Sequence, residues 1–142
     1  MEIELKYTIE DAEAVKKIFA DPYIEMIKDK QTEEDIDMHA VYFDTEDRCL
    51  YREGIAFRVR KEGELLQATL KWNGSSEGGM HKREEINVPV DDEAKLHTPD
   101  VDIFEQSEMC EVMKKIVGGR TLVPMMDVNF IRHQVRIYRK ID

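Results

Sequence analysis

The N-terminal segment MEIELKY alternates charged and apolar residues. With the two-residue period of a β-strand, Glu2, Glu4 and Lys6 lie on one side and the apolar residues between them lie on the other. Two carboxylates at positions i and i+2 of a strand are about 7 Å apart. Hard oxygen ligands at this spacing suit a hydrated Mg²⁺ or Mn²⁺, which also bridges phosphates. The segment therefore predicts a metal-binding strand with a lysine beside it.

Basic residues recur with the same alternation in four later segments, always opposite the Ile, Val and Leu positions. The polar sides together carry seven cations, Lys6, Arg58, Arg60, Lys71, Arg83, Arg132 and Arg136, and three acids, Glu2, Glu4 and Glu85. Two arginines at i and i+2 direct their guanidinium groups the same way, and phosphate oxygens accept such donors bidentately. The alternative interpretation is an ordinary solvated sheet face decorated with cross-strand ion pairs.

Composition limits the classes of protein that fit. The 142 residues are 42% hydrophobic and 37% charged, which predicts a single domain, 1–142, with a core that needs no disulfide or structural metal. Cys49 and Cys110 are isolated in the sequence, no apolar run of roughly 18 residues is present, and no secretion signal is apparent, so we expect a cytoplasmic protein without a membrane span. A formal charge of −10 argues against DNA binding and requires any anion to meet a local concentration of cations.

The expected elements follow from periodicity. We predict a helix capped by Thr8 with a second apolar patch after Pro22, a polar loop over 28–35, and a mobile Gly/Ser loop over 73–81. A later helix has one apolar face from Met109 to Val117 and ends at Gly118. Strands are expected over 1–7, 36–45, 55–63, 65–72, 82–90 and 126–142.

The helices must cover the apolar side of this sheet, because their apolar stripes need an apolar surface. If the sheet curls, its polar side becomes the interior of a barrel, where charged groups are costly unless a charged ligand and water accompany them. The predicted fold class is α+β: an antiparallel β-barrel with helices packed outside. By parity Trp72 belongs to the helix-covered side, and Asp44 is expected to fix a turn.

Six segments in order resemble the CYTH superfamily, the triphosphate tunnel metalloenzymes. They are the Glu-x-Glu-x-Lys of MEIELKY, YFDT (42–45), FRVRKEG (57–63), TLKW (69–72), REEIN (83–87) and Arg132 in the last strand. The resemblance implies a tunnel of about eight antiparallel strands that holds a triphosphate beside a divalent metal, Mg²⁺ or Mn²⁺.

Site roles follow from the resemblance by position. Glu2, Glu4 and Glu85 would bind the metal, and Lys6 and Glu85 would act in catalysis. The phosphate ligands would be Lys6, Arg58, Arg60, Lys71, Arg83 and Arg132, and Arg136 joins them by strand parity alone. The implied function is metal-dependent hydrolysis of inorganic triphosphate or a small organic triphosphate. The alternatives are an adenylyl cyclase of class IV type and a non-catalytic polyphosphate- or nucleotide-binding module.

The sequence departs from the family pattern in two places. Asn87 stands where the family has a second glutamate in its Arg-x-Glu-x-Glu strand, and the late Glu-x-Glu strand that closes the family's barrel has no counterpart here. We therefore expect a barrel that is open at its C-terminal end, with either a gap in its wall or a homodimer that pairs the free strand edges.

Overall fold

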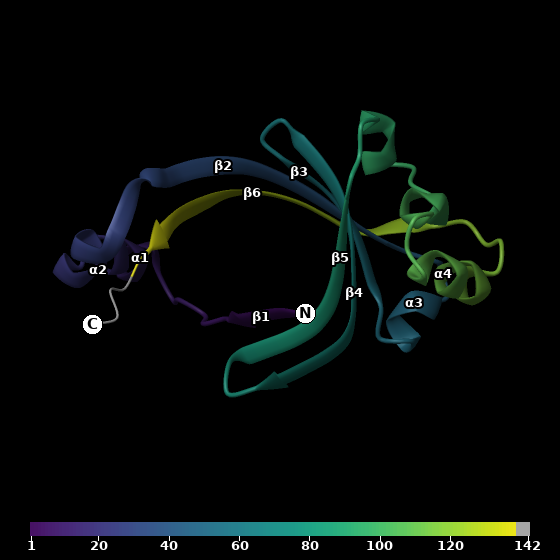
Figure 1. The fold of residues 1–142 in the computed structure, drawn as a ribbon, viewed down its shortest axis with the longest axis horizontal. Helices are drawn as coiled ribbons and strands as arrows, with labels where there is room; N and C mark the ends of the chain where they lie inside the picture. Colours follow the sequence, from purple (N-terminus) through teal and green to yellow (C-terminus); the bar gives the residue numbers. More distant parts are fainter. Residues whose placement is uncertain (139–142) are drawn as a thin grey trace.

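The structure is a computed structural model, and it describes residues 1–138. Six antiparallel strands form one sheet: β1 (Glu2–Leu5), β2 (Lys28–Asp44), β3 (Ala56–Glu62), β4 (Leu65–Glu77), β5 (Met80–Pro89) and β6 (Val123–Ile137). Their order in the sheet is β1-β5-β4-β3-β2-β6, so β1 and β6 are its two edges. The sheet is strongly bent, with β2 and β6 arching on one side and β1 lying within the bend (Figure 1). The predicted antiparallel sheet is confirmed, and it is an open rather than a closed barrel.

The helices gather at two places. At one end lie α3 (Cys49–Arg52), α4 (Met109–Val117) and the 3₁₀ turns η1 (Glu93–Leu96) and η2 (Val101–Phe104), whereas α1 (Ala12–Phe19) and α2 (Pro22–Ile27) lie at the other end (Figure 1). The predicted helix α4 is confirmed, and it ends where Gly118 takes the left-handed conformation at φ 62°. None of the helices within residues 1–138 is long and apolar enough to cross a membrane.

The core lies between the apolar side of the sheet and the α3–α4 layer. Phe57, Val59 and Leu70 from the strands pack with Phe104 and Met113, and all five are at most 1% exposed. The alternation in β3 and β4 places their apolar residues on this side, as predicted, and their polar residues on the opposite side. We call that opposite side the polar face.

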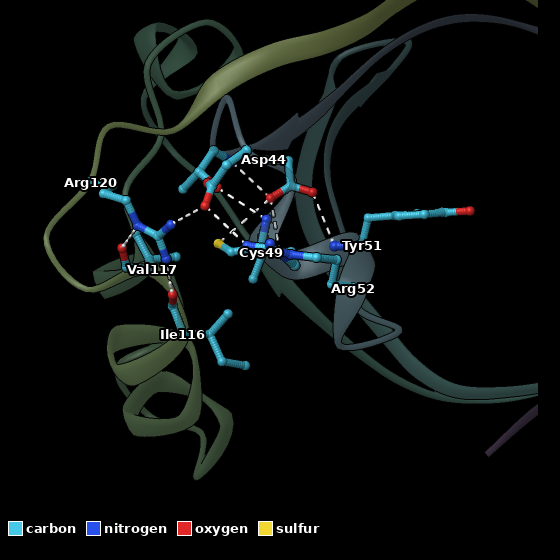
Figure 2. A network of polar contacts seen from close by, with 10 residues as sticks. Asp44, Cys49, Tyr51, Arg52, Ile116, Val117 and Arg120 are labelled. Atoms are coloured by element: carbon cyan, nitrogen blue, oxygen red, sulfur yellow. Dashed lines mark hydrogen bonds and ion pairs between the residues drawn. The ribbon is translucent and has the colours of Figure 1, made fainter.

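A buried carboxylate fixes the turn from β2 into α3. Asp44 is 6% exposed, and its oxygens accept hydrogen bonds from the backbone N–H groups of Thr45 (2.7 Å), Leu50 (2.9 Å) and Tyr51 (3.0 Å). Figure 2 shows these contacts with the neighbouring cluster, in which Arg120 donates to the carbonyls of Ile116 and Val117 at the end of α4. The expectation that Asp44 fixes a turn is confirmed.

Three expectations about the elements are wrong. The first helix starts at the Asp11 cap rather than at Thr8, and it buries no residue, because it lies on the far end of the β2–β6 arm rather than over the apolar side of the sheet. The predicted loop over 28–35 is part of β2, whose register with β6 shifts between Asp29 and Glu34. The predicted loop over 73–81 mostly continues β4 and β5, and only Gly78-Gly79 forms the turn.

Candidate functional site

Two arginines dominate the middle of the polar face. Arg58 and Arg60 project from β3, and Arg58 is 9% exposed. Arg58 has one hydrogen bond, from Nη2 to the Thr69 hydroxyl at 3.4 Å, and forms no ion pair within residues 1–138. Arg60 pairs with Glu62 on its own strand. Burial, together with the charges of Arg58 and Arg132, lowers the pKa of Arg60, so three guanidinium groups share this region.

Both arginines keep a buried donor without an acceptor. Among the residues described, the Nε atoms of Arg58 and Arg60 are buried and have no hydrogen-bond partner. An unsatisfied buried donor on a charged group costs free energy, and such groups in native proteins call for a missing partner. The polar face therefore has the electrostatic character of an anion site.

Thr69 and Asn87 form a chain of hydrogen bonds that ends at Arg58. The Thr69 side chain is 1% exposed, and its hydroxyl donates to Asn87 Oδ1 at 2.7 Å while it receives the Arg58 contact. Thr69 lies opposite both residues in the sheet, Arg58 on β3 and Asn87 on β5. Because Asn87 is neutral, this position of β5 offers Arg58 no carboxylate to neutralise it.

A lysine and two carboxylates lie beside the arginines. Lys71 Nζ donates to Glu2 Oε1 at 3.0 Å and is 4.0 Å from Glu85. The hydrogen bond with Glu85, together with Lys71, lowers the pKa of Glu2 to about 2. Burial and the same contact with Glu2 raise the pKa of Glu85. The two carboxyl groups thus hold one proton between them more readily than two isolated glutamates would.

The carboxylates of Glu2, Glu4 and Glu85 are candidate ligands for a hydrated divalent cation. Glu2 Oε2 is buried and accepts no hydrogen bond in the described part of the chain, although Lys71 Nζ lies 2.9 Å away. Glu4 also contributes to lowering the pKa of Glu2, so it faces the same region. No three His, Cys, Asp or Glu side chains among residues 1–138 meet the geometry of a ready metal cluster. With fewer protein ligands than a dedicated metal cluster has, the carboxylates suit only an ion such as Mg²⁺ that keeps several waters and takes further oxygens from phosphates.

Three other predicted site residues lie around the arginines and the carboxylates. Lys6 pairs with Glu4 at 2.8 Å and is largely exposed. Arg83 lies opposite Glu2 in the register of β1 and β5. Arg132 lies opposite Ile36 on β2, close enough to Arg60 to lower its pKa.

Arg136 does not join the cluster. It lies opposite Asp29 near the end of the β2–β6 arm, and its backbone N–H donates to the Thr32 hydroxyl. Four residues of strand separate it from Arg132, which is roughly 13 Å. Shared strand parity alone predicted that it would bind phosphate, and no contact among residues 1–138 brings it near Arg58.

Two residues of the site were missed by sequence reasoning. Residue alternation places Thr69 on the polar side of its strand, but its central contact follows only from the β3–β4 register. Tyr51 lies in α3, a four-residue helix that the sequence periodicity does not reveal. It lines a pocket with Lys71 and Arg83.

Comparisons with known proteins bear on the family and the fold of the chain. A family model described as CYTH domain matches residues 1–141. An inorganic triphosphatase from Haemophilus influenzae is 39% identical over 49 residues, which are 34% of this chain and 14% of that protein.

Two solved structures share the fold. An adenylyl cyclase candidate from Hippeastrum with a dominant triphosphatase activity superposes with a TM-score of 0.69 at 18% identity, covering 94% of this chain and 66% of that one. An adenylate cyclase candidate from Bacillus halodurans gives a TM-score of 0.54 at 20% identity, covering 91% and 65%. The chain thus spans slightly less than two thirds of the length of either structure, and these likenesses concern the fold alone.

Proposed function

The chain belongs to the CYTH domain family, and from this premise we propose that it is a divalent-metal-dependent triphosphatase that acts on inorganic triphosphate or a small organic triphosphate. The observation that carries the proposal is Arg58, a guanidinium that is 9% exposed, has no ion-pair partner among residues 1–138 and keeps an orphaned Nε. A phosphate chain supplies the negative charge and the acceptors that such a group lacks.

Each group of residues has a distinct task in this proposal. Arg58, Arg60, Lys71, Arg83 and Arg132 would bind the phosphate oxygens, and the buried guanidinium groups would stabilise charge that develops on the transferred phosphoryl group. Lys6, which follows β1 and is largely exposed, would bind a phosphate from the Glu4 side of the site.

Glu2, Glu4 and Glu85 would hold the metal, which when bound neutralises phosphate charge and lowers the pKa of water. The raised pKa of Glu85 opposes metal binding, because both carboxylates must be deprotonated to act as ligands.

The test is release of phosphate from tripolyphosphate with Mg²⁺ or Mn²⁺. Glu85→Gln is expected to reduce turnover at least tenfold, while Glu84→Gln, on the opposite side of the same strand, keeps it within about twofold. Equal activity of the two variants would remove Glu85 from the site. No turnover by the wild-type protein with either metal would refute the proposed activity.

A second candidate is a non-catalytic module that binds triphosphates. It is favoured by the lack of a three-residue acidic cluster among residues 1–138 and by Asn87. Calorimetric binding of tripolyphosphate without release of phosphate would support this candidate over the enzyme.

Of the two expectations for the open barrel, the gap in the wall agrees with the unpaired edges β1 and β6 of the described sheet. A homodimer remains a prediction, and light scattering in solution tests it. Cytoplasmic location likewise stays a prediction from the sequence.

A further inference from the structure

Arg58 lies in a row of residues across the sheet that contains no acid. The strand register pairs Arg58 with Tyr42 of β2 and with Thr69 of β4, and it extends the row to Met126 of β6 and Asn87 of β5. Residues directly opposite one another on neighbouring strands have side chains close enough to interact. No member of this row offers Arg58 a carboxylate.

Two neighbouring cations of the polar face do have carboxylate partners. Lys71 donates to Glu2 at 3.0 Å, and Arg60 pairs with Glu62 on its own strand. Arg58 is 9% exposed and has only the long hydrogen bond to a hydroxyl among residues 1–138. The composition of its row therefore leaves this buried guanidinium with its full charge.

The Asn87 amide contacts a neighbour on each of its two sides. Its Oδ1 accepts from the Thr69 hydroxyl at 2.7 Å, and the same hydroxyl accepts from Arg58 Nη2 at 3.4 Å. Burial raises the pKa of the Glu85 carboxyl, and a hydrogen bond with the Asn87 side chain works against that rise. An asparagine both accepts and donates without adding a charge, whereas an ionised aspartate only accepts.

We propose that Asn87 is a positioning residue: its neutral amide anchors Arg58 through Thr69 and leaves the guanidinium charge for the ligand, so that the chain binds a triphosphate as the metal-free anion. The inference rests on the proposed function, since it takes Arg58 as a phosphate ligand. The buried Nε of Arg58, which has no acceptor in the described part of the chain, is the donor that a phosphate oxygen meets.

The experiment measures tripolyphosphate binding by calorimetry, once with a chelator and once with Mg²⁺. Asn87→Asp keeps the shape of the side chain and the acceptor for Thr69, but it adds a negative charge two hydrogen bonds away from Arg58. Binding in chelator is expected to weaken about tenfold, because the new carboxylate offsets the charge of Arg58. With Mg²⁺ the loss shrinks to about threefold or less, because the cation offsets the added carboxylate.

The matched control is Asn129→Asp, the same chemical change on the other side of the sheet. Asn129 is exposed on β6 and lies opposite His39 in the register. This variant is expected to keep the wild-type affinity within about twofold in both conditions, because its new charge faces away from Arg58 and is screened by water.

The role of Thr69 is tested without any change of charge. Thr69→Val removes the hydroxyl at nearly constant volume, so Arg58 loses its one hydrogen bond, and metal-free binding is expected to weaken about fivefold. Mg²⁺ does not restore the affinity of this variant, because no carboxylate has been added. Thr69→Ser keeps the hydroxyl and the wild-type affinity.

The outcomes separate this inference from the proposed function. Equal metal-free affinity of the wild-type protein and Asn87→Asp, or a loss that Mg²⁺ does not reduce, overturns the role of Asn87 and leaves the triphosphatase standing. Wild-type binding that requires Mg²⁺ also overturns the inference, whereas phosphate release would still support the enzyme. Metal-free binding that Asn87→Asp weakens, without phosphate release on addition of either metal, supports the inference and overturns the proposed activity. A wild-type protein that binds tripolyphosphate in neither condition overturns both.

Discussion

Replacement of Arg58 with methionine is expected to make the unliganded protein more stable and to abolish its binding of triphosphate. Arg58 is buried, and its one hydrogen bond, to Thr69, is long at 3.4 Å. Its Nε has no acceptor within the described residues. Methionine fills a similar volume without a charge and adapts its shape to the space. Thr69 keeps its hydrogen bond to Asn87, so the substitution leaves no polar group newly orphaned.

The expected gain in stability follows from the missing hydrogen-bond and ion-pair partners of Arg58. A buried donor without a partner costs about 1–3 kcal/mol, and replacing buried charges with apolar residues of similar volume often stabilises a protein by about 1–4 kcal/mol. We expect a gain of about 2 kcal/mol in the free energy of unfolding. The entropy of unfolding for a protein of this length is roughly 0.3 kcal/mol/K near 60 °C, so Tm rises by about 7 °C.

The assay is thermal unfolding with and without tripolyphosphate. At a concentration of 100 times Kd, the ligand adds about 2.7 kcal/mol to the stability of the wild-type protein, or roughly 9 °C in Tm. Arg58→Met shows no such shift. Lys61→Met is the matched control, because Lys61 lies on the other side of the same strand and pairs with Glu93; it keeps the ligand-induced shift. A lower Tm for unliganded Arg58→Met, or a retained shift, would refute the reasoning.

Three further changes have expected outcomes. Asp44→Asn leaves backbone N–H groups without a carboxylate acceptor and should lower the free energy of unfolding by about 2–3 kcal/mol in urea titrations; a change below 0.5 kcal/mol would contradict the role of Asp44. Arg120→Ala removes donors from two carbonyls at the end of α4 and should cost about 1 kcal/mol by the same measurement, whereas an unchanged stability would show that water replaces them. The carboxylate of Asp35 and, less strongly, that of Glu33 raise the pKa of His133. Protonated His133 therefore stabilises the folded protein; this contribution is complete below about pH 6.5 and is lost as the pH rises through the folded-state pKa. His133→Gln should therefore destabilise the protein at pH 6 but not at pH 9, and an equal loss at both values would assign the effect to packing.

The alternation of residues predicted to which side of the sheet each side chain points. It did not predict which of these side chains are buried. Glu2 does face the cation cluster, as the pattern indicated. Ile3 and Leu5, expected to pack under helices, are each 59% exposed, and Ile131 is 67% exposed. Periodicity assigns a residue to a side of a strand, whereas burial depends on the neighbouring elements. These residues lie in β1 and β6, the two edges of the sheet, beyond the reach of the α3–α4 layer.

The helices show the same limit. The stripe and the glycine stop of α4 are local signals, and α4 packs against the core as predicted. The stripe of α1 is equally clear, but its position depends on the long β2–β6 arm, part of which has the polar composition of a loop. Pairing with β6 overrides that local preference.

The candidate site was predictable where one strand determines it. Spacing alone brings Arg58 and Arg60 together on β3. The contacts of Thr69 require the register of three strands, and the position of Tyr51 requires a turn fixed by a tertiary contact with Asp44. Arg136 was predicted by parity alone, and a register shift in β2 lies between its partner Asp29 and the partners of Arg132 and Gln134.

The carboxylates on β1 should separate from the site more often than the arginines on β3. Its four residues, Glu2–Leu5, pair with β5 alone and expose their apolar side chains, whereas Arg58 and Arg60 lie on a central strand over the core. Short edge segments open at a small fraction of the global unfolding free energy, so backbone amides of β1 should exchange with solvent long before those of β3. Each such opening carries Glu2 and Glu4 away while the guanidinium groups stay in place. Warming should therefore weaken the proposed cation site before the proposed phosphate site.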